Sequence, residues 1–274
     1  MTRETGAGTP SGEVSCLDGR IAATGDTFLP VSDEGFLRGD GAFEVIRVYS
    51  GVPFALDDHL ERLGRSAASL LLTPTPRAEL QEDVSRTLAA RGDAFEGCLR
   101  VVLTRGGRRL VMTEPLPPHA DRVRLGFVTF APTRVLDGVK SLSYAANMLS
   151  SRLARQRGFD EALLVTPHAR VLEAPTSSLF WADADGRLVT PPLDDHILAS
   201  ITRDRLLRLV EVEERPTSTD DLLGATEAFL ASTTREVHPV AAIEERDFSG
   251  VGPRTHEAAE AFRAHLRDAL TGAG

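Results

Sequence analysis

Short apolar stretches around Asp-Gly and Ser-Gly pairs begin the sequence and predict two β-hairpins. The first surrounds Asp18 and Gly19 in VSCLDGRIAA, and the second surrounds Ser50 and Gly51 in AFEVIRVYSGVPFAL. Such pairs are typical of two-residue hairpin turns, in which both turn residues take a positive φ. We therefore expect an antiparallel sheet near the N-terminus.

Two helices are expected after these hairpins. Apolar side chains recur at intervals of three and four between residues 60 and 70. They follow two aspartates, Asp57 and Asp58, either of which can cap the helix. The segment 76–91 begins with a proline and is followed by a glycine, which are the usual signals for the start and the end of a helix.

The next strands and a break in the pattern suggest a domain boundary. Segments 98–107 and 121–130 predict strands on either side of a long polar loop. The sequence APTRVLDG then introduces proline, aspartate and glycine, which favours a linker. We expect a disordered tail at 1–12, a small α+β domain at 13–130, a linker at 131–138 and a larger domain at 139–274.

The second half of the chain alternates strand-like and helical runs. A helix is expected from about residue 144, followed by strand-like runs in EALLVT, RVLEA, SLFWA and RLVT. A loop that turns into an amphipathic helix follows in ILASITRDRLLRLVEV, and then two more strands and a C-terminal helix. Strands and helices mixed in two blocks indicate an α/β protein, with an α+β small domain plus a larger mixed α/β domain.

Composition argues against several classes of protein. The net charge of −9 disfavours nucleic acid or an anionic membrane as a partner. Cys16 and Cys98 stand far apart without a Cys/His cluster, so neither a metal site nor a disulfide framework is indicated. No apolar run approaches ~18 residues, and the N-terminus lacks the apolar core of a signal peptide. We expect a cytoplasmic protein.

Lys140 is the only lysine among 31 cationic side chains. Arginine replaces lysine well in surface charge, ion pairs and phosphate binding, but it is a poor nucleophile and keeps its proton. A desolvated lysine can form an imine with a carbonyl, so Lys140 is a candidate Schiff-base lysine. The alternative is a lysine that survived a compositional bias by chance. Class I aldolases also use such a lysine, but the early hairpins argue against their (β/α)₈ barrel.

A pyridoxal enzyme needs further parts: an acid for the pyridine nitrogen, a phosphate cradle and a place for the substrate carboxylate. Ser200 and Thr202 stand at the expected start of a helix, which suits an anion but is also explained by N-capping alone. Thr233 and Thr234 could present N–H and hydroxyl groups to an anion or form an ordinary turn.

Two charged residues complete the candidates. Glu173 ends a strand-like run at an Ala-Pro turn, and Arg62 lies on an expected helix. Each could equally be a solvated surface residue, because charged side chains at such positions are mostly exposed.

Seven segments, in order along the chain, resemble the class IV aminotransferases, which are the fold-type IV pyridoxal-phosphate enzymes. This group includes D-amino acid aminotransferase, branched-chain aminotransferase and aminodeoxychorismate lyase. The resemblance runs from about Ser32 to Val240. The segments are GFLRGDGAFEVIRVYSG, HLERL, VKSLSYAAN, GFDEALLV, VLEAPTSSLFW, TPPLDDHILASITR and STTREVHPV.

The resemblance implies a role for each candidate residue. Lys140 would carry pyridoxal 5'-phosphate and then move a proton between the substrate Cα and the cofactor C4′. Glu173 would pair with the pyridinium nitrogen, and Leu198 would pack on the ring face. Tyr144 would hydrogen-bond the phenolic oxygen of the cofactor. The residues that would hold the phosphate are Arg62, Ile201, Thr202 and Thr233.

Spacing and one missing pair indicate the branch of the family. No extra residue separates Lys140 from the tyrosine helix, as in D-amino acid aminotransferases and the lyase. The typical D-amino acid enzyme carries an Arg-x-His pair after the strand VVLTRGG, and this chain has no histidine there. We therefore expect a D-amino acid transaminase that binds the substrate carboxylate differently. The expected substrate-binding residues are Arg38, Phe43, Arg105, Arg108 and Thr234.

Alternatives to this activity stay open. They are branched-chain L-amino acid transamination, aminodeoxychorismate cleavage and a non-catalytic pyridoxal-phosphate carrier. Ser200 stands where the family usually has glycine, and Ser178 where it usually has asparagine. The resemblance also implies a homodimer with the active site near the interface and the cofactor in the cleft between the two domains. The substrates would be amino acids and keto acids such as 2-oxoglutarate or pyruvate.

Overall fold

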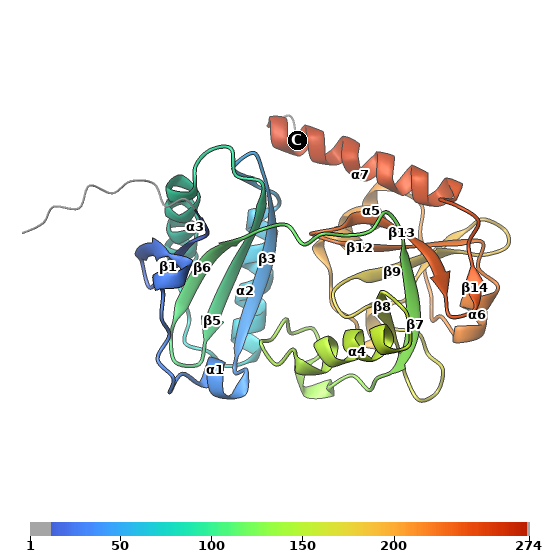
Figure 1. Ribbon diagram of the computed structural model, residues 1–274, viewed down its shortest axis with the longest axis horizontal. Helices are drawn as coiled ribbons and strands as arrows, with labels where there is room; N and C mark the ends of the chain where they lie inside the picture. The colour runs from blue at the N-terminus through green and yellow to red at the C-terminus, as the bar shows by residue number, and fades with distance from the viewer. Residues whose placement is uncertain (1–11, 273–274) are drawn as a thin grey trace, which may run out of the picture. The chain divides into compact units, whose positions relative to one another are not determined.

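The computed structural model describes residues 12–272, which form two compact units. The first unit ends at Leu116 and the second begins at Pro117, and each has its own sheet (Figure 1). The expected α/β class with two domains is thereby confirmed. The tail expected at 1–12 lies, up to residue 11, outside the described residues.

The first unit is built on a six-stranded antiparallel sheet in the order β2-β1-β6-β5-β3-β4. Both expected hairpins are present in it. Asp18 and Gly19 join the first with φ values of 51° and 82°, and Ser50 and Gly51 join the second with 45° and 80°. Positive φ at both residues matches the turn to the twist of its strands. The strands are β1 (Val14–Leu17), β2 (Arg20–Ala23), β3 (Gly41–Tyr49), β4 (Val52–Pro53), β5 (Gly97–Thr104) and β6 (Arg109–Glu114).

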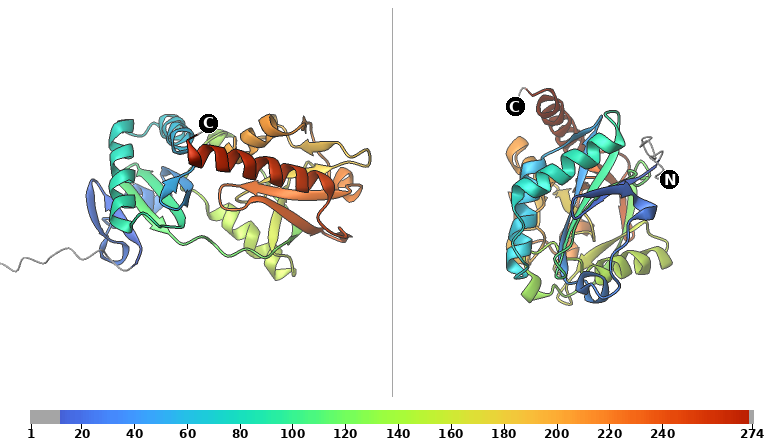
Figure 2. Two further views of the ribbon diagram at one scale, coloured as in Figure 1. Left: turned by 90° about the horizontal axis from the view of Figure 1, so that it is seen from above. Right: turned by 90° about the vertical axis from the view of Figure 1, so that its left-hand side faces the viewer.

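Helices α2 (Leu56–Ser69) and α3 (Arg77–Arg91) cover one face of this sheet (Figure 2). Their buried apolar side chains join those of the strands in one cluster. α2 begins after Ala55, which is left-handed, so the prediction that Asp57 or Asp58 caps the helix is wrong. Both aspartates lie in the first turn, where a carboxylate still stabilises the helix N-terminus. The shorter helices of this unit are η1 (Thr24–Asp26) and α1 (Glu34–Arg38).

β6 occupies the segment that the sequence predicted to be a long polar loop. Val111 and Thr113 are buried while the other residues of the strand are half-buried; the sequence RLVMTE does not show this alternation, because the half-buried Leu110 and Met112 are also apolar. Arg109 forms ion pairs with Glu79 and Asp83 of α3. The local pattern was insufficient because pairing with β1 and β5 on both sides stabilises this strand.

The second unit contains a mixed sheet in the order β11-β10-β9-β12-β13-β7-β8, with β14 paired to β13. β7 pairs in parallel with β8 and with β13, which both come later in the chain. Residues 117–130 therefore belong to this unit, and the boundary lies before the predicted linker at 131–138. The strands are β7 (Val123–Thr129), β8 (Glu161–Val165), β9 (Ser178–Ala182), β10 (Leu188–Thr190), β11 (Glu213–Glu214), β12 (Glu227–Ser232), β13 (Glu236–Ile243) and β14 (Arg246–Asp247).

The helices of the second unit pack on two parts of the sheet. α4 (Ala145–Gln156) contacts β7 and β8, and α5 (Ile201–Leu209) packs with α7 (Pro253–Thr271) against β12 and β13. Leu163 and Leu164 of β8 enter different apolar clusters, as in a strand that is covered on both faces. None of the helices within residues 12–272 is long and apolar enough to cross a membrane. The shorter helices are η2 (Arg134–Leu136), η3 (Leu193–Asp195) and α6 (Thr219–Leu223).

A carboxylate from the sheet caps the last helix. Glu227 of β12 accepts hydrogen bonds from the backbone nitrogens of Arg254 (3.0 Å) and Thr255 (2.7 Å) and from the Thr255 hydroxyl (2.6 Å). A Cβ on Gly252 would lie 2.3 Å from the Glu227 carboxyl carbon, so glycine is required at the start of the helix. The negative charge at the N-terminus of α7 fixes this helix to β12.

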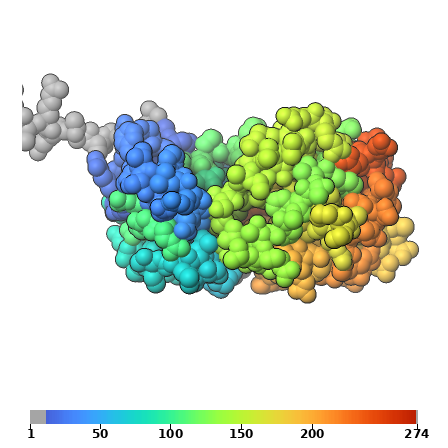
Figure 3. Space-filling view, turned by 90° about the horizontal axis from the view of Figure 1, so that it is seen from below, coloured from blue at the N-terminus to red at the C-terminus, as the bar shows by residue number. Residues whose placement is uncertain are grey.

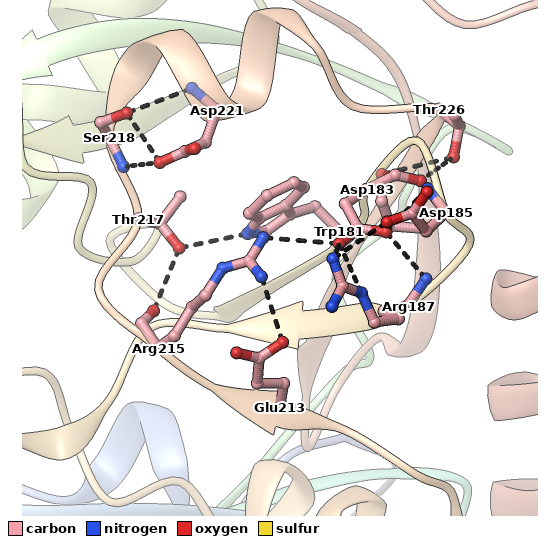
Figure 4. A network of polar contacts seen from close by, with 11 residues as sticks. Trp181, Asp183, Asp185, Arg187, Glu213, Arg215, Thr217, Ser218, Asp221 and Thr226 are labelled. Carbon is pink, nitrogen blue, oxygen red and sulfur yellow. Dashed lines mark hydrogen bonds and ion pairs between the residues drawn. The ribbon is translucent and has the colours of Figure 1, made fainter.

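A polar network around Trp181 fastens two loops of the second unit (Figure 4). The indole nitrogen donates to the Thr217 hydroxyl at 3.2 Å, and the Arg215 guanidinium lies 5.2 Å from the centroid of the Trp181 ring. Arg215 also pairs with Glu213 and, more distantly, with Asp183. These contacts satisfy the polar edge of a buried tryptophan, and we assign them to the fold.

Candidate active site

Lys140 lies in the second unit, between η2 and α4. It is half-buried, and its Nζ is 5.5 Å from the centroid of the Tyr144 ring. The one lysine of the sequence thus lies beside an aromatic ring at the start of α4.

Tyr144 and Asn147 connect the start of α4 to the loop that carries Glu173. The Tyr144 hydroxyl donates to the carbonyl oxygen of Pro175 at 2.6 Å, and Asn147 Nδ2 donates to the same oxygen at 3.1 Å. A hydroxyl has one proton, so in this arrangement Tyr144 can offer a bound group only an acceptor. The predicted hydrogen bond of Tyr144 to a phenolic oxygen of the cofactor stays a prediction. Asn147 was missed, because nothing in its local sequence marks it.

Glu173 is half-buried at the end of a segment that hydrogen-bonds to β8. Its backbone oxygen accepts from the nitrogen of Leu164 at 2.9 Å. Its side-chain Oε1 accepts from the backbone nitrogen of Leu198 at 3.1 Å. Because one carboxylate oxygen is anchored in this way, the charge of Glu173 has a fixed position beside the loop that leads into α5.

The loop from Leu198 ends in the N-terminus of α5. Ser200 is the N-cap and its Oγ accepts from the backbone nitrogen of Arg203 at 3.3 Å, so the N-capping interpretation of this serine is confirmed. Ile201 and Thr202, the first two residues of the helix, are buried. The positive end of the helix dipole and the first backbone N–H groups form an anion-binding element at this point.

Thr233 and Thr234 lie in the turn between β12 and β13 and are half-buried. A bond from the Arg235 nitrogen to the Ser232 oxygen (3.3 Å) closes this turn. Ala231 pairs with Ser178, which places the end of β12 beside the start of β9, a few residues after Glu173.

Three serine hydroxyls at the meeting point of these two strands lack a hydrogen-bond partner within the described part of the chain. They belong to Ser177, Ser178 and Ser232, and all three are buried. Buried hydroxyls without partners are uncommon in native proteins and often mark the place of a bound group or water. The second unit thus contains an amine, a carboxylate, a helix N-terminus and hydroxyls without partners, on segments that contact or pair with one another.

Arg62 lies in the first unit, in a buried cluster with Glu44 and His59. Its Nε and Nη2 each donate to a Glu44 carboxylate oxygen at 2.7 Å, and His59 Nδ1 is 2.8 Å from Glu44 Oε2. Burial by itself would raise the pKa of Glu44, but the bonds from Arg62 and His59 outweigh it and lower the pKa to about 2. Sequence reasoning missed Glu44, although a glutamate inside the apolar run GAFEVI was a usable signal.

Replacing Glu44 with glutamine is expected to lower the free energy of unfolding by about 3–5 kcal/mol at pH 7, because the buried ion pair of Arg62 with the Glu44 carboxylate would be lost. The folded pKa of Glu44 is depressed, so this stabilisation is complete above about pH 4.5 and is lost as the pH falls toward 2. Urea unfolding of both proteins between pH 7 and pH 3 measures the difference. Glu61→Gln, which breaks an exposed pair with Arg65 on the same helix, is the matched control. Equal costs for the two variants would contradict the buried-cluster argument.

Arg105 fastens the C-terminus of α2 in the first unit. Its guanidinium donates to the carbonyl oxygens of Leu70 and Leu71, both at 2.5 Å, and its Nε pairs with Asp40 at 2.9 Å. Cations at a helix C-terminus stabilise its unpaired carbonyls. The structure therefore gives Arg105 a place in the fold, and its predicted contact with substrate stays a prediction.

The other residues expected at the substrate also lie in the first unit, except for Thr234. Arg108 pairs with Asp18 at 2.8 Å, and Arg38, at the end of α1, pairs with Glu34 in the same helix. Phe43 is buried in β3. Their roles toward substrate stay predictions.

Comparison with known proteins gives a consistent set of relatives. A sequence model of amino-transferase class IV matches residues 41–243. A Methanocaldococcus jannaschii protein, provisionally named branched-chain-amino-acid aminotransferase, is 34% identical over 90% of this chain and 94% of its own length. D-alanine aminotransferase of Bacillus licheniformis is 30% identical over 86% of this chain and 90% of its own length.

A solved structure has the same fold. It is a hypothetical aminotransferase from Mycobacterium tuberculosis in its PLP-bound form, 25% identical, with a TM-score of 0.83. The match covers 92% of this chain and 98% of that one.

Proposed function

Since the chain belongs to the class IV aminotransferase family, we propose that it binds pyridoxal phosphate through Lys140 and transfers amino groups between α-amino acids and α-keto acids. The observation that carries this proposal is the chain of contacts in the second unit. Lys140 lies against Tyr144, Tyr144 bonds to Pro175 beside Glu173, and Glu173 bonds to Leu198 ahead of α5.

The residues of the second unit fit the cofactor. The buried hydroxyls of Ser177, Ser178 and Ser232, which lack partners among the described residues, are available as donors to a phosphorylated ligand. The N-terminus of α5 suits a phosphate, and the PLP-bound relative supports the same ligand. Residues proposed to hold the cofactor are Lys140, Tyr144, Glu173, Leu198, Ile201, Thr202 and Thr233, together with Arg62 of the first unit.

Pyridoxal phosphate, when bound, supplies an aldehyde for the amino group and a ring that withdraws electrons from the substrate Cα. Lys140 would hold the cofactor covalently and, once released, would take the proton from the substrate Cα and return it at C4′ of the cofactor. Glu173 would hold a proton on the ring nitrogen, because its carboxylate is fixed and negatively charged. Tyr144 would orient Lys140 through the contact of its ring with Nζ.

The test is a transamination screen. Purified protein loaded with pyridoxal phosphate is mixed with D- and L-amino acids, using 2-oxoglutarate or pyruvate as acceptor, and the new amino acid is measured. Formation of aminobenzoate and pyruvate from aminodeoxychorismate, with no amino transfer, would replace the proposal by the lyase. A bound cofactor whose spectrum no amino acid changes would indicate a carrier.

For the substrate we propose D-amino acids, on the spacing between Lys140 and the tyrosine helix and on the D-alanine aminotransferase relative. One observation favours branched-chain L-amino acids instead. Arg105 is engaged by Asp40 and by the end of α2, so it is not poised as a carboxylate clamp, and the turn at Thr233 and Thr234 could hold the carboxylate through its N–H groups. The screen separates the two candidates directly.

Removing Arg38 is expected to raise KM for amino acids by about ten- to a hundredfold, if this arginine holds the carboxylate, because a charge-assisted contact contributes on the order of 1.5–3 kcal/mol. An (R)-amine without a carboxylate should be affected much less. Arg38 is exposed and pairs only within α1 in the described structure, so Arg38→Ala should fold normally. Arg65→Ala, another exposed arginine in an i,i+4 pair, is the control. Equal losses for acid and amine would move the carboxylate site to the turn at Thr233.

We also propose that the protein is a homodimer, on an exposed apolar strip in the first unit. Phe28, Val31 and Phe36 are 77%, 79% and 68% exposed. This segment is seen in blue on the surface in Figure 3. Buried Asp33 holds it in place by accepting from the Gly35 nitrogen (2.8 Å) and the Thr104 hydroxyl (2.9 Å). A fixed segment that presents large apolar side chains fits a second copy of the chain.

Replacing Phe36 with aspartate is expected to shift the protein from dimer to monomer, because the charge would have to be desolvated in the interface. Sedimentation or light scattering at several concentrations gives the mass. Val52→Asp, at an exposed position of β4 outside the strip, should remain dimeric. A Phe36→Asp protein that kept the wild-type mass at every concentration would place the interface elsewhere.

A further inference from the structure

Arg235 follows directly on the turn of Thr233 and Thr234, and its side chain is only 10% exposed. Its Nη2 pairs with Glu161 of β8, and its Nη1 lies 3.2 Å from Nδ1 of His238 on β13. Glu161 is itself buried and bonds to the Ser151 hydroxyl of α4 at 3.1 Å. One guanidinium therefore connects the turn to β8, which is separated from β13 by β7 in the sheet, and to β13 itself.

The contacts of His238 define its tautomer. Its Nε2 is 2.6 Å from the carbonyl oxygen of Ala120, which can only accept, so Nε2 carries the proton. Nδ1 is then the unprotonated nitrogen and accepts from Arg235. His238 is thus a neutral acceptor for Nη1 of Arg235. Both terminal nitrogens of the guanidinium therefore have a defined partner.

The turn needs such support. Glu236, the first residue of β13, has φ of 56°, a left-handed conformation that is unfavourable for a residue with a side chain. A bond from the Arg235 nitrogen to the Ser232 oxygen closes the turn at 3.3 Å, which is long for a hydrogen bond. Strained residues of this kind persist when surrounding contacts over-determine them.

We propose that Arg235, clamped by Glu161 and His238, is a positioning residue that fixes the Thr233–Thr234 turn for binding an anionic group. The inference rests on the proposed function, in which this turn contributes to the phosphate and carboxylate sites. The neighbouring buried hydroxyl of Ser232, which lacks a partner within residues 12–272, points to a ligand at the same turn. In this proposal Arg235 does not contact the phosphate or the carboxylate. It holds in place the backbone of Thr233 and Thr234, which would contact them.

The chain offers a matched control at the other end of the same strand. Glu244 follows β13 directly and is bound by Arg157, which also donates to the carbonyl oxygen of Phe127 at 2.6 Å. Arg157→Gln and Arg235→Gln each remove an arginine that links β13 to the rest of the sheet. Only Arg235 adjoins the turn.

The experiment compares wild type, Arg235→Gln, Arg235→Lys and Arg157→Gln by titration of the protein with pyridoxal phosphate, by steady-state kinetics and by amide hydrogen exchange of residues 232–236. Arg235→Gln should raise the Kd for the cofactor and KM for amino acids by about tenfold each, with a smaller change in kcat. Arg235→Lys should recover part of this loss, because lysine keeps a positive charge beside Glu161. It lacks the two separate nitrogens with which Arg235 contacts Glu161 and His238. Arg157→Gln should lower the melting temperature and leave Kd and KM unchanged.

Amide exchange separates failure of the inference from failure of the proposed function. If wild type binds no pyridoxal phosphate, the proposed function is wrong, and the inference is judged on exchange alone. Faster exchange at residues 233–235 in Arg235→Gln, but not in Arg157→Gln, supports the positioning role. Equal Kd, KM and local exchange in the two glutamine variants would overturn it and leave Arg235 as an ordinary stabilising residue.

Discussion

Replacing Lys140 with alanine is expected to lower kcat for transamination by at least about a thousandfold, because both the covalent anchor and the base for the substrate Cα proton are lost. No other side-chain amine exists in the sequence to take over. Single-turnover mixing with an amino acid, followed by absorbance of the cofactor, measures the loss. Lys140→Arg should be equally inactive, since a guanidinium keeps its proton.

Because the chain has a single lysine, covalent labelling with pyridoxal phosphate also tests this assignment. Borohydride treatment of wild type with pyridoxal phosphate should place the label on the peptide that contains Lys140. The α-amino group of the chain is the remaining amine, so a label there in wild type would argue against the assignment. A Lys140→Ala protein with wild-type turnover would refute the proposed function as a whole.

Replacing Glu173 with glutamine is expected to lower kcat by about a hundredfold while the Kd for pyridoxal phosphate changes little. A glutamine oxygen can still accept from the Leu198 nitrogen, now 3.1 Å from Oε1, so the loop keeps its position. The substitution therefore removes the negative charge while keeping this bond, and with the charge goes the means of keeping the ring nitrogen protonated. Steady-state kinetics and cofactor titration on the same preparations separate the two effects.

A matched control exists for Glu173. Asp160 also accepts from a backbone nitrogen, that of Arg124 at 2.7 Å, and lies in the same unit. Asp160→Asn should leave kcat unchanged. Normal turnover in Glu173→Gln would assign that carboxylate to the loop and require another partner for the ring nitrogen.

Local sequence predicted the elements whose stability is local. The turns at Asp18-Gly19 and Ser50-Gly51 and the capped start of α5 at Ser200 agree with the structure. Each depends on the conformational preference of a few adjacent residues. The predicted start of α2 was less accurate, because Ala55 takes a left-handed conformation that alanine does not favour by itself.

Pairing between distant segments accounts for the misplaced boundary. β7 was assigned to the first domain because its partners, β8 and β13, could not be known from its own residues. β6 was taken for a loop because its residues show no polar–apolar alternation, whereas pairing with β1 and β5 on both sides stabilises it as a strand. Strand pairing is non-local, so local periodicity does not determine it.

The chemistry of Lys140 was indicated by the sequence alone, because a lone lysine among arginines points to what only an amine can do. The ion pairs of Arg62 with Glu44 and of Arg235 with Glu161 were decided by the tertiary structure. In each pair the two residues are separated in the chain. The guanidinium needs a carboxylate beside it only because folding buries it. Sequence therefore determined that this protein has one lysine and predicted its role, whereas folding decided which charges are paired, since an uncompensated charge is tolerated in water and not in a core.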